Sequence, residues 1–459
     1  VLQGSPLGAF CHDSQEDAGS FAQIMNCCGY DYVTLGNHDF NYGMAYLDSY
    51  LDALEARCVC QNALRSDGTV RFPSRVHVLE NGLRVGVVGI VTDHVNVWER
   101  PEHLSGLTIT DPIPAARAAL EALRGQADLT VCVYHGGFER DLATGRILSA
   151  SSENIAYRLC QELDFDILLT GHQHMCIPGQ SLFGTFAVQA PDSGRAFISL
   201  KTVVADGHIV CNSQAIPAGG DCDPILLDRF GNLEQGAQTW LDTVVGRLDR
   251  PLLPAPPLIM AAEGSDIADF FNEVQMSCSG AQLAATSLAN EIAGFPQTVR
   301  RRDVLTAYPY TNTLTVLRVT GSVLRRAMER SAEYFAVDEE GRLRVADAFL
   351  KPKVEHYNYD YFSGVNYAFD ISRPEGQRVV ELTYRGEAVK DEDEFTICLN
   401  SYRASGAGGY PEYTQCQVVR EINVEMSDLI LDFFKNTPKV SLKTHRWFTV
   451  YTSPGIGAL

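Results

Sequence analysis

The sequence lacks long apolar runs and an excess of basic residues. No window of its 459 residues reaches the 18 or so consecutive apolar residues that a membrane-spanning helix requires, so we predict no membrane span. Lys and Arg number 37 against 57 Asp and Glu, which gives a formal net charge of −20. Such a surface repels a nucleic-acid backbone, so we predict a small-molecule ligand and no nucleic-acid polymer as partner.

The thirteen cysteines lack the regular spacing of a disulfide framework. Cys27 and Cys28 are adjacent, whereas Cys132, Cys160 and Cys398 fall within apolar segments, where a free thiol behaves as a small hydrophobic group. Reduced thiols are therefore favoured. They indicate the cytoplasm or an anaerobic habitat, with export to the periplasm or cell surface as the alternative.

The length of the chain and its 45% hydrophobic content predict two domains with well-filled cores. Residues 1–222 alternate strand-like runs with helical stretches, which indicates an α/β layered domain. Residues 223–257 combine a helical pattern with closely spaced prolines, and we expect a helical linker there. Residues 258–459 mix helical and strand patterns and predict a second domain of α+β character.

Three motifs place histidine directly after an apolar, strand-like run. They are Gly36-Asn-His-Asp-Phe40, His135-Gly-Gly137 and Gly171-His-Gln-His174. Side chains at the carboxyl ends of neighbouring strands converge on one crevice, where α/β sheets hold their ligands. The amide oxygen and the neutral imidazole suit transition metals of the Zn, Mn and Fe group. We therefore predict the dinuclear metal site of a phosphoesterase.

Each motif also has an ordinary structural interpretation. A single histidine at the end of a strand can be a hydrogen-bonded residue of the core or the surface. Gly-Asn-His alone can form a turn, because Asn and Gly both tolerate positive φ. The His-x-His pattern at 172–174 favours a metal more strongly, because alternate residues point the same way. The three motifs together favour the metal site over these alternatives.

These motifs resemble those of the 5′-nucleotidases and 2′,3′-cyclic-nucleotide 2′-phosphodiesterases, which are built on a calcineurin-like metallophosphoesterase domain. The resemblance covers essentially the whole chain. It includes Gln3-Gly-Ser-Pro6, Gln189-Ala-Pro-Asp-Ser-Gly-Arg195, Tyr310-Thr-Asn-Thr-Leu314, Ser363-Gly-Val-Asn-Tyr367 and Asn400-Ser-Tyr-Arg-Ala-Ser-Gly-Ala-Gly-Gly-Tyr410. The last two are most similar to the cyclic-nucleotide phosphodiesterase branch. The resemblance implies a four-layer α/β metallophosphoesterase sandwich followed by a smaller α+β substrate-binding domain.

The resemblance also implies two divalent metal ions, such as Zn, Mn, Fe or Co, as cofactors. It implies Asn37, His135 and His172 as ligands of one ion and His174 as a ligand of the other. The family's remaining ligands lie in an Asp-x-His motif and a Gly-Asp motif. Both would precede Val1, so we expect a segment upstream of this sequence.

His38 is the predicted catalytic residue. It adjoins Asn37 and so points elsewhere, which suits contact with the phosphoryl group or protonation of the leaving oxygen. In the 5′-nucleotidase branch an Asp three residues later orients this histidine. That position is Asn41 here, which is more typical of the cyclic-nucleotide branch, so the partner of His38 is Asn41 or another group. The ordinary alternative for His38 is a scaffolding role at the rim of the site.

The second domain contains a dense aromatic cluster. Relatives clamp the nucleobase between two aromatic rings, and stacking of this kind contributes ~1–3 kcal/mol per base. The resemblance assigns Tyr402 as one ring and Phe362 as the other. Tyr357, Tyr359 and Tyr361 compete with Phe362 because they are so close in the sequence. Alternatively, Phe362 belongs to the core of the sheet.

We predict a two-domain enzyme that hydrolyses nucleotide phosphoesters. The expected substrates are 2′,3′-cyclic nucleotides and nucleoside monophosphates, and we expect a monomer or a weak oligomer. A 5′-nucleotidase with UDP-sugar or diphosphate hydrolase activity is one alternative, although residues 287–295 lack the arginine that this branch uses. A catalytically inactive nucleotide-binding protein is the other alternative.

Overall fold

The computed structural model describes residues 2–14, 18–147, 153–205, 207–310, 312–351, 353–422, 424–442 and 448–451. Thr311, which belongs to one of the predicted motifs, lies outside these ranges. The contacts within the chain divide it into two compact units, residues 1–237 and 238–459. This division falls inside helix α7 (Pro224–Leu241), within the segment predicted as a linker.

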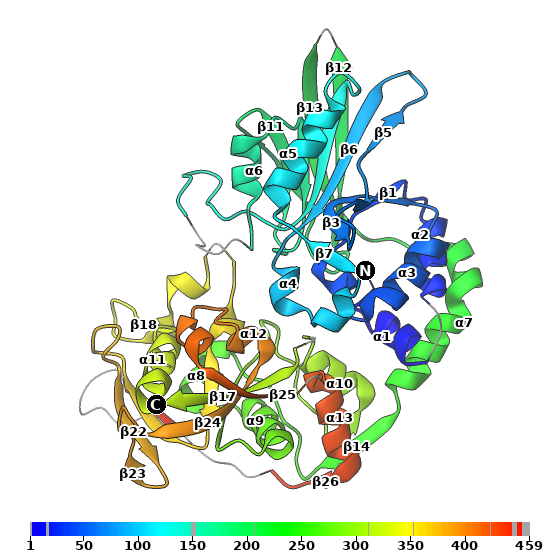
Figure 1. Cartoon of the computed structure of the whole chain (residues 1–459). Helices are drawn as coiled ribbons and strands as arrows, with labels where there is room; N and C mark the ends of the chain where they lie inside the picture. Colours follow the sequence, from blue (N-terminus) through cyan, green and yellow to red (C-terminus); the bar gives the residue numbers. More distant parts are fainter. Residues whose placement is uncertain are drawn as a thin grey trace. The chain divides into compact units, whose positions relative to one another are not determined.

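A six-stranded sheet in the order β10-β11-β9-β8-β6-β5 organises unit 1 (Figure 1). Its strands are β5 (Arg75–Val78), β6 (Arg84–Val91), β8 (Leu129–His135), β9 (Ile167–Thr170), β10 (Ile177–Leu182) and β11 (Thr185–Gln189). Strands β6, β8, β9 and β11 run parallel, whereas β5 and β10 are antiparallel at the edges. Strand β6 is buried along most of its length, as expected for a parallel strand covered by other layers.

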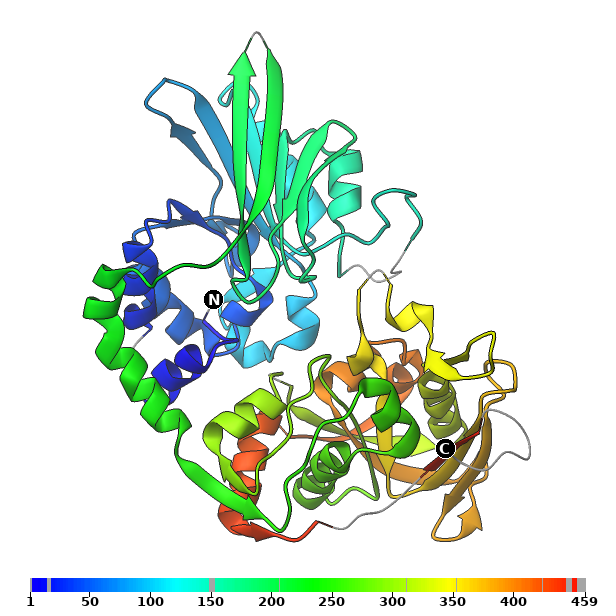
Figure 2. The same ribbon diagram turned by 180° about the vertical axis from the view of Figure 1, so that it is seen from behind.

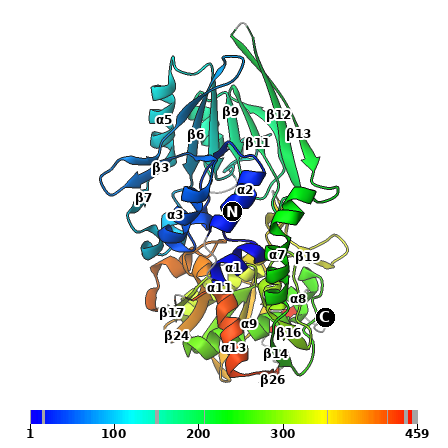
Figure 3. The ribbon, with the colours of Figure 1, turned by 90° about the vertical axis from the view of Figure 1, so that its right-hand side faces the viewer.

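Helices α5 (Pro112–Leu123) and α6 (Ala156–Glu162) pack on this sheet (Figures 1 and 3). Local residues set the start of α5: the carboxylate of Asp111 accepts a hydrogen bond from the backbone N–H of Ile113, and Pro112 opens the helix. Apolar side chains of both helices share one core with residues of β6, β8 and β9. This core holds the parallel strands in place, so the positions of their carboxyl ends are well defined.

A second core in unit 1 forms around the amino-terminal helices. These are α1 (Pro6–Asp13), α2 (Gly19–Cys27) and α3 (Gly43–Ala53). They pack with a parallel pair, β1 (Tyr32–Val33) and β2 (Arg57–Cys58), and with an antiparallel sheet, β4 (Val70–Phe72), β3 (Cys60–Arg65) and β7 (Leu107–Ile109). Two hairpins complete the unit, β10–β11 and the longer β12 (Ala196–Ala205) and β13 (His208–Pro217), which Figure 2 shows in green.

Unit 2 is built on a five-stranded sheet in the order β20-β15-β24-β17-β25. The strands are β15 (Leu283–Ser287), β17 (Leu314–Thr320), β20 (Asp360–Ser363), β24 (Glu394–Asn400) and β25 (Gln417–Ile422). Helices α9 (Asp266–Ser279), α11 (Gly321–Ala332) and α13 (Met426–Asn436) contribute to a core that is rich in Phe and Tyr. Apart from β15 and β24, neighbouring strands in this sheet are antiparallel. The predicted fold class, α/β followed by α+β, is confirmed.

Smaller sheets complete unit 2. One contains β16 (Thr298–Arg300), β14 (Val244–Leu248) and β26 (Lys439–Val440), so part of the predicted linker segment is a strand of this unit. Another contains β23 (Glu387–Ala388), β22 (Val379–Tyr384), β21 (Asn366–Asp370) and β27 (Phe448–Tyr451).

The cysteines and the helices bear on two features of the composition. All thirteen cysteines are free thiols, and eight of them are buried or adjoin the cores described above: Cys11, Cys58, Cys60, Cys132, Cys160, Cys278, Cys398 and Cys416. Across the described ranges, no helix combines the length and the apolar character that crossing a bilayer would require.

Candidate active site

The loop after β1 is built around a buried carboxylate. Asp39 accepts hydrogen bonds from the backbone N–H of Gly36 at 2.8 Å and of Leu2 at 3.2 Å. Residues Asn37–Asp39 form a single 3₁₀ turn, η1. Gly36 leaves no room for a side chain, because a Cβ there would lie 2.8 Å from Cε1 of His135. The backbone of this loop therefore passes directly over His135, which brings Asn37 to the end of β8.

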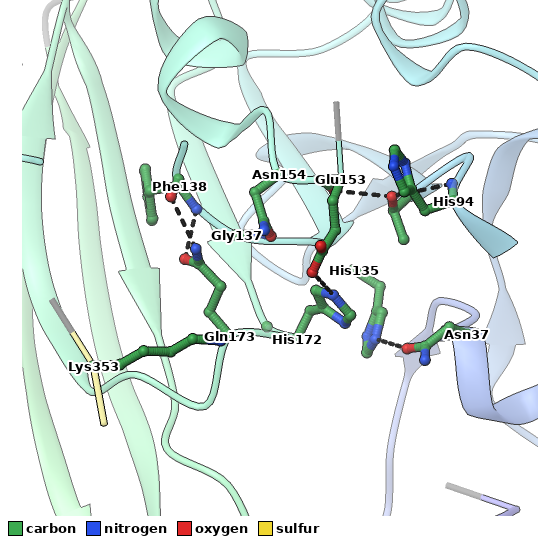
Figure 4. A network of polar contacts seen from close by, with 12 residues as sticks. Asn37, His94, His135, Gly137, Phe138, Glu153, Asn154, His172, Gln173 and Lys353 are labelled. Carbon is green, nitrogen blue, oxygen red and sulfur yellow. Dashed lines mark hydrogen bonds and ion pairs between the residues drawn. The ribbon is translucent and has the colours of Figure 1, made fainter. Parts of the chain in front are cut away.

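Three of the predicted metal ligands come together (Figure 4). Oδ1 of Asn37 lies 2.9 Å from Nε2 of His135, the last residue of β8. The ring of His172, in the turn after β9, has its centroid 5.4 Å from that of His135. An amide oxygen and two imidazoles from three separate segments thus face one another, as the strand-end argument predicts.

The His-x-His turn has an unusual backbone. His172 has a φ of 69° and His174 a φ of 58°, which places both residues in the left-handed region. Residues other than glycine occupy this region at a cost of about 1–3 kcal/mol, and such residues cluster at functional sites. The N–H of Gln173 closes the turn by donating to the carbonyl of Gly171 at 2.7 Å. Contacts with the neighbouring loop stabilise this strained backbone conformation.

Gln173 provides those contacts through both atoms of its amide group (Figure 4). Its Nε2 donates to the carbonyl of Phe138 at 2.9 Å, and its Oε1 accepts from the N–H of Phe138 at 2.7 Å. Oδ1 of Asn154 accepts from the N–H of Gly137 at 2.7 Å in the same loop. The loops after β8 and β9 are therefore fastened to each other. Gln173 stands inside a motif that the sequence singles out, but its role is visible only in the structure.

His172 has two supporting residues that the sequence does not reveal. Its Nε2 lies 2.9 Å from Oε1 of Glu153, and because a carboxylate only accepts, Nε2 is the nitrogen that carries the proton in this contact. The other nitrogen, Nδ1, is then left for a ligand. The ring also stacks on Trp98, with centroids 5.4 Å apart and planes 24° apart. Neither Glu153 nor Trp98 belongs to a recognisable motif, so no pattern could have identified them.

The electrostatic environment keeps His135 neutral. Burial lowers the pKa of His135 below its ordinary value, and the neighbouring His172 lowers it further. Neutral imidazole is the form that binds metal ions. Asn37, His135 and His172 therefore fit a divalent transition metal in the chemistry of their donor atoms.

His174, the predicted ligand of the second ion, is exposed. It lies near Asp192. Burial by itself raises the pKa of Asp192, but the hydrogen bond from Ser193 and the charge of His174 outweigh burial, so the pKa of Asp192 is lowered. Within the described parts of the chain, no three His, Cys, Asp or Glu side chains are grouped closely enough to hold a metal ion. The three predicted donors that come together thus include an amide, and both metal ions stay predictions.

His38 has the partner that the sequence proposes first. Its Nδ1 lies 2.9 Å from Oδ1 of Asn41. Asn41 follows the 3₁₀ turn that also holds Asn37, so one short segment presents both a predicted ligand and the predicted catalytic residue. Nδ1 of His38 is engaged with Asn41, whereas Oδ1 of Asn37 faces His135.

In unit 2 the predicted base-binding rings differ in exposure. Phe362, in β20, is 2% exposed and packs edge to face against Tyr367 in the core. Tyr359 and Tyr361 are buried as well. All four residues of β20 are buried, whichever face of the sheet they point to. The geometry therefore favours the alternative that Phe362 is a core residue. Tyr402 is only half-buried and begins a short helix, α12 (Ser401–Ala404).

Tyr357 is half-buried, unlike the other competitors of Phe362. A buried arginine joins its segment to that of Tyr402. Arg403 donates to both oxygens of Asp360 at 2.8 and 2.9 Å and to the carbonyl of Tyr357 at 3.0 Å. The side chains of Arg403 and Asp360 are each 1% exposed. Tyr357 and Tyr402 are the two candidate rings that remain partly accessible. The ion pair between Arg403 and Asp360 therefore links the two chain segments that carry these rings.

Two known families match this chain in part. Residues 11–176 match the calcineurin-like phosphoesterases, and residues 244–415 match the 5′-nucleotidase C-terminal domain. The chain is 24% identical to the trifunctional nucleotide phosphoesterase protein YfkN of Bacillus subtilis, over 96% of this chain and 34% of that protein. It therefore spans about a third of that relative's length. It is 22% identical to a 2′,3′-cyclic-nucleotide 2′-phosphodiesterase/3′-nucleotidase of Haemophilus influenzae, over 95% of this chain and 76% of that protein.

Solved structures agree with these matches. A Staphylococcus aureus protein described as a candidate 5′-nucleotidase, crystallised with alpha-ketoglutarate, is 32% identical and superposes with a TM-score of 0.89. That match covers 98% of this chain and 89% of the other. A 5′-nucleotidase precursor from Thermus thermophilus, 19% identical, has the same fold with a TM-score of 0.65 over 95% of this chain and 86% of the other.

Proposed function

Because this chain belongs to the 5′-nucleotidase family and carries a calcineurin-like phosphoesterase domain, we propose that it hydrolyses nucleotide phosphoesters. The family assignment made from the motifs is confirmed. The expected substrates are 2′,3′-cyclic nucleotides and nucleoside monophosphates. The observation that carries the proposal is the 2.9 Å approach of Asn37 Oδ1 to His135 Nε2 beside the ring of His172.

The families to which the chain belongs depend on divalent metals. We infer that Asn37, His135 and His172 hold one ion of the Zn, Mn, Fe or Co group, and that His174 belongs to the site of a second. When bound, such ions neutralise the phosphoryl oxygens and lower the pKa of water that attacks phosphorus. The chain is acidic overall, with a formal net charge of −20, which supports a metal as the source of positive charge at the site.

The remaining roles belong to side chains of the protein. His38 contacts the phosphoryl group or protonates the leaving oxygen through Nε2, because Nδ1 is engaged with Asn41. In unit 2, Tyr402 stacks on the nucleobase, and the exposure of Tyr357 makes it a better second ring than Phe362. Glu153 and Trp98 orient His172 without contacting the substrate.

A substrate panel tests the proposal. The full-length protein is assayed with Mn²⁺, Zn²⁺ or Co²⁺ against 2′,3′-cyclic nucleotides, 3′- and 5′-mononucleotides, nucleoside diphosphates and UDP-sugars. We expect turnover of cyclic nucleotides and monophosphates that EDTA removes and that His135→Ala and His172→Ala abolish. His208→Ala, an exposed histidine on β13, is the matched control and leaves turnover unchanged.

Two other results would contradict the proposal in different ways. Faster turnover of UDP-sugars or diphosphates than of cyclic nucleotides would favour the 5′-nucleotidase alternative. Tight nucleotide binding without turnover under any metal would favour the inactive binding protein.

A further inference from the structure

A chain of polar contacts leads away from His38 into the interior of unit 1. Oδ1 of Asn41 faces His38, and its Nδ2 donates to Oε2 of Glu99 at 2.9 Å. The other oxygen of Glu99 accepts from Nδ1 of His103 at 2.8 Å and from the backbone N–H of Arg100 at 2.9 Å. The side chain of Glu99 is 6% exposed. A nearly buried carboxylate thus stands directly behind the partner of the predicted catalytic histidine.

The chemistry of these groups decides which way each one is turned. An amide has one end that accepts and one that donates, whereas a carboxylate only accepts. Since Glu99 accepts, the atom of Asn41 that faces it must be the NH₂ group. The carbonyl oxygen of Asn41 must then face His38, and Nδ1 of His38 must carry a proton to donate to it. The orientation of an amide is ordinarily ambiguous, but here Glu99 removes the ambiguity.

The segment that carries Glu99 serves both halves of the candidate site. Glu99 directly follows helix α4 (Val95–Trp98), whose last residue stacks on the ring of His172. His103 lies in the following 3₁₀ turn, η2 (Pro101–Leu104). One short stretch of chain therefore orients a predicted metal ligand on one side and His38 on the other.

We propose that Glu99 is a positioning residue that fixes the amide of Asn41 and thereby reserves Nε2 of His38 for the substrate. This inference rests on the proposed function, in which His38 acts on the phosphoryl group or the leaving oxygen. Glu99 does not touch the substrate and acts only through Asn41. This chain places a neutral amide next to this histidine and a carboxylate one step further away.

Three variants test the arrangement by exchanging donors and acceptors. In Glu99→Gln the carbonyl oxygen keeps accepting from the N–H of Arg100 and from His103, so the new NH₂ group faces the NH₂ group of Asn41. Asn41 then turns over, and Nδ1 of His38 loses its acceptor. Asn41→Asp directs one carboxylate at another. The double variant Asn41→Asp/Glu99→Gln restores a complementary pair, because the new Gln donates to the new Asp. We expect each single variant to lower kcat about 100-fold with KM nearly unchanged, and the double variant to recover most of the loss.

Glu102→Gln is the matched control, because Glu102 is an exposed neighbour in the same turn and its side chain has no part in these contacts. Its kcat stays at the wild-type value. Thermal unfolding of every variant is measured alongside, so that kcat is compared at a temperature where all are folded. The inference would be overturned if the losses in kcat of the two single variants added up in the double variant, or if the variants changed KM and not kcat. Glu99 would then be a structural residue.

A second measurement separates this inference from the proposed function. The protein is labelled with ¹⁵N-histidine, and the His38 signal is assigned by its absence in His38→Gln. We expect the proton of neutral His38 on Nδ1 in the wild type and on Nε2 in Glu99→Gln, whether or not the protein turns over a nucleotide. An inactive protein with this tautomer shift would refute the proposed function alone. An active protein with the same tautomer in both forms would refute the role of Glu99 alone.

Discussion

The two units hold their predicted functional residues in different ways. In unit 1 the residues stand at or near strand ends, half-buried or exposed, and they are oriented by hydrogen bonds between loops, such as that of Gln173 with Phe138. In unit 2 the aromatic residues lie along a strand and a short helix, and most of them are buried in the core. There a buried ion pair, Arg403 with Asp360, holds the segments that carry the two half-buried rings.

The difference shows where each unit is vulnerable. A change near His135 in unit 1 alters the geometry of a few polar atoms while the cores beneath stay intact. A change at Arg403 in unit 2 leaves a buried charge without a partner, so the fold of that unit suffers first. Unit 1 variants should therefore lose activity before stability, and unit 2 variants should lose stability before activity. The exception in unit 2 is a variant of a solvent-exposed ring, which should lose activity before stability.

The largest expected effect is on the stability of unit 2. Arg403→Met leaves Asp360 buried and unpaired, and breaking a buried pair in this way costs about 3–5 kcal/mol. Differential scanning calorimetry of the full chain would show a lowered transition for unit 2. Arg318→Met, which removes an exposed pair with Glu394, is the control and costs less than about 1 kcal/mol. Equal losses of stability in Arg403→Met and Arg318→Met would contradict the view that unit 2 depends on its buried ion pair.

In unit 1 we expect a loss of activity without a loss of fold. Gly36→Ala places a methyl group 2.8 Å from the ring of His135 and must displace it. The backbone of Gly36 has a φ of −108°, which alanine adopts without strain, so the effect comes from the ring. We expect kcat/KM to fall about 10- to 100-fold. Gly219→Ala, where a Cβ meets open space, should leave kcat/KM unchanged; a similar loss there would point to a general effect of the substitution.

The exposed rings of unit 2 should behave like unit 1. Tyr402→Ala removes one stacking partner and should raise KM for nucleotides about 5- to 100-fold, which corresponds to ~1–3 kcal/mol. Phe362→Leu conserves most of the volume of a core residue, so it should cost less than about 1.5 kcal/mol of stability and leave KM unchanged. Steady-state kinetics of both variants would check this. A raised KM for Phe362→Leu would return Phe362 to the base-binding site.

The smallest effect is a pH dependence of stability that belongs to unit 2. Burial, followed by the charges of Asp266 and Glu273, raises the pKa of Asp269 in α9 to about 7. Between pH ~4 and ~7 the folded carboxyl group holds a proton that the unfolded chain has released, so stability falls as pH rises through this window. The fall is at most about 4 kcal/mol, and about 1–2 kcal/mol once partial solvation is allowed for.

Asp269→Asn should remove this fall. The variant should be more stable than the wild type at pH 8 and similar to it at pH 4, as measured by urea unfolding at both values. Glu381→Gln, at an exposed position of β22, serves as the control. A wild type that gains stability between pH 4 and pH 8 by the same amount as Asp269→Asn would contradict the assignment.

Much of the fold was predictable because it depends on local pattern. The β-branched run at 84–91 and the run that ends in His135 are strands β6 and β8 with those bounds. Asp111 and Pro112 mark the start of α5, because a cap and a first-turn proline act within a few residues. The meeting of Asn37, His135 and His172 followed from one rule about the carboxyl ends of parallel strands.

The second base-binding ring was not predictable in the same way. Phe362 and Tyr357 are five residues apart in one aromatic cluster, and both have the composition of a stacking ring. Which of them is exposed depends on the sheet that β20 joins, and hence on pairings with residues far away in the sequence. The half-buried Tyr357 and the buried Phe362 differ only in that context.

The sequence by itself determined the family, the two-part architecture and the short list of histidines, because motifs and periodicity are properties of neighbouring residues. Only the tertiary structure decided which groups hold those histidines in position: Glu153 and Trp98 beside His172, and Glu99 behind Asn41. These supporting groups come from segments between 19 and 74 residues away from the residues they orient. A hydrogen bond or a stacked ring depends on distance in space, and no pattern along the chain records that distance.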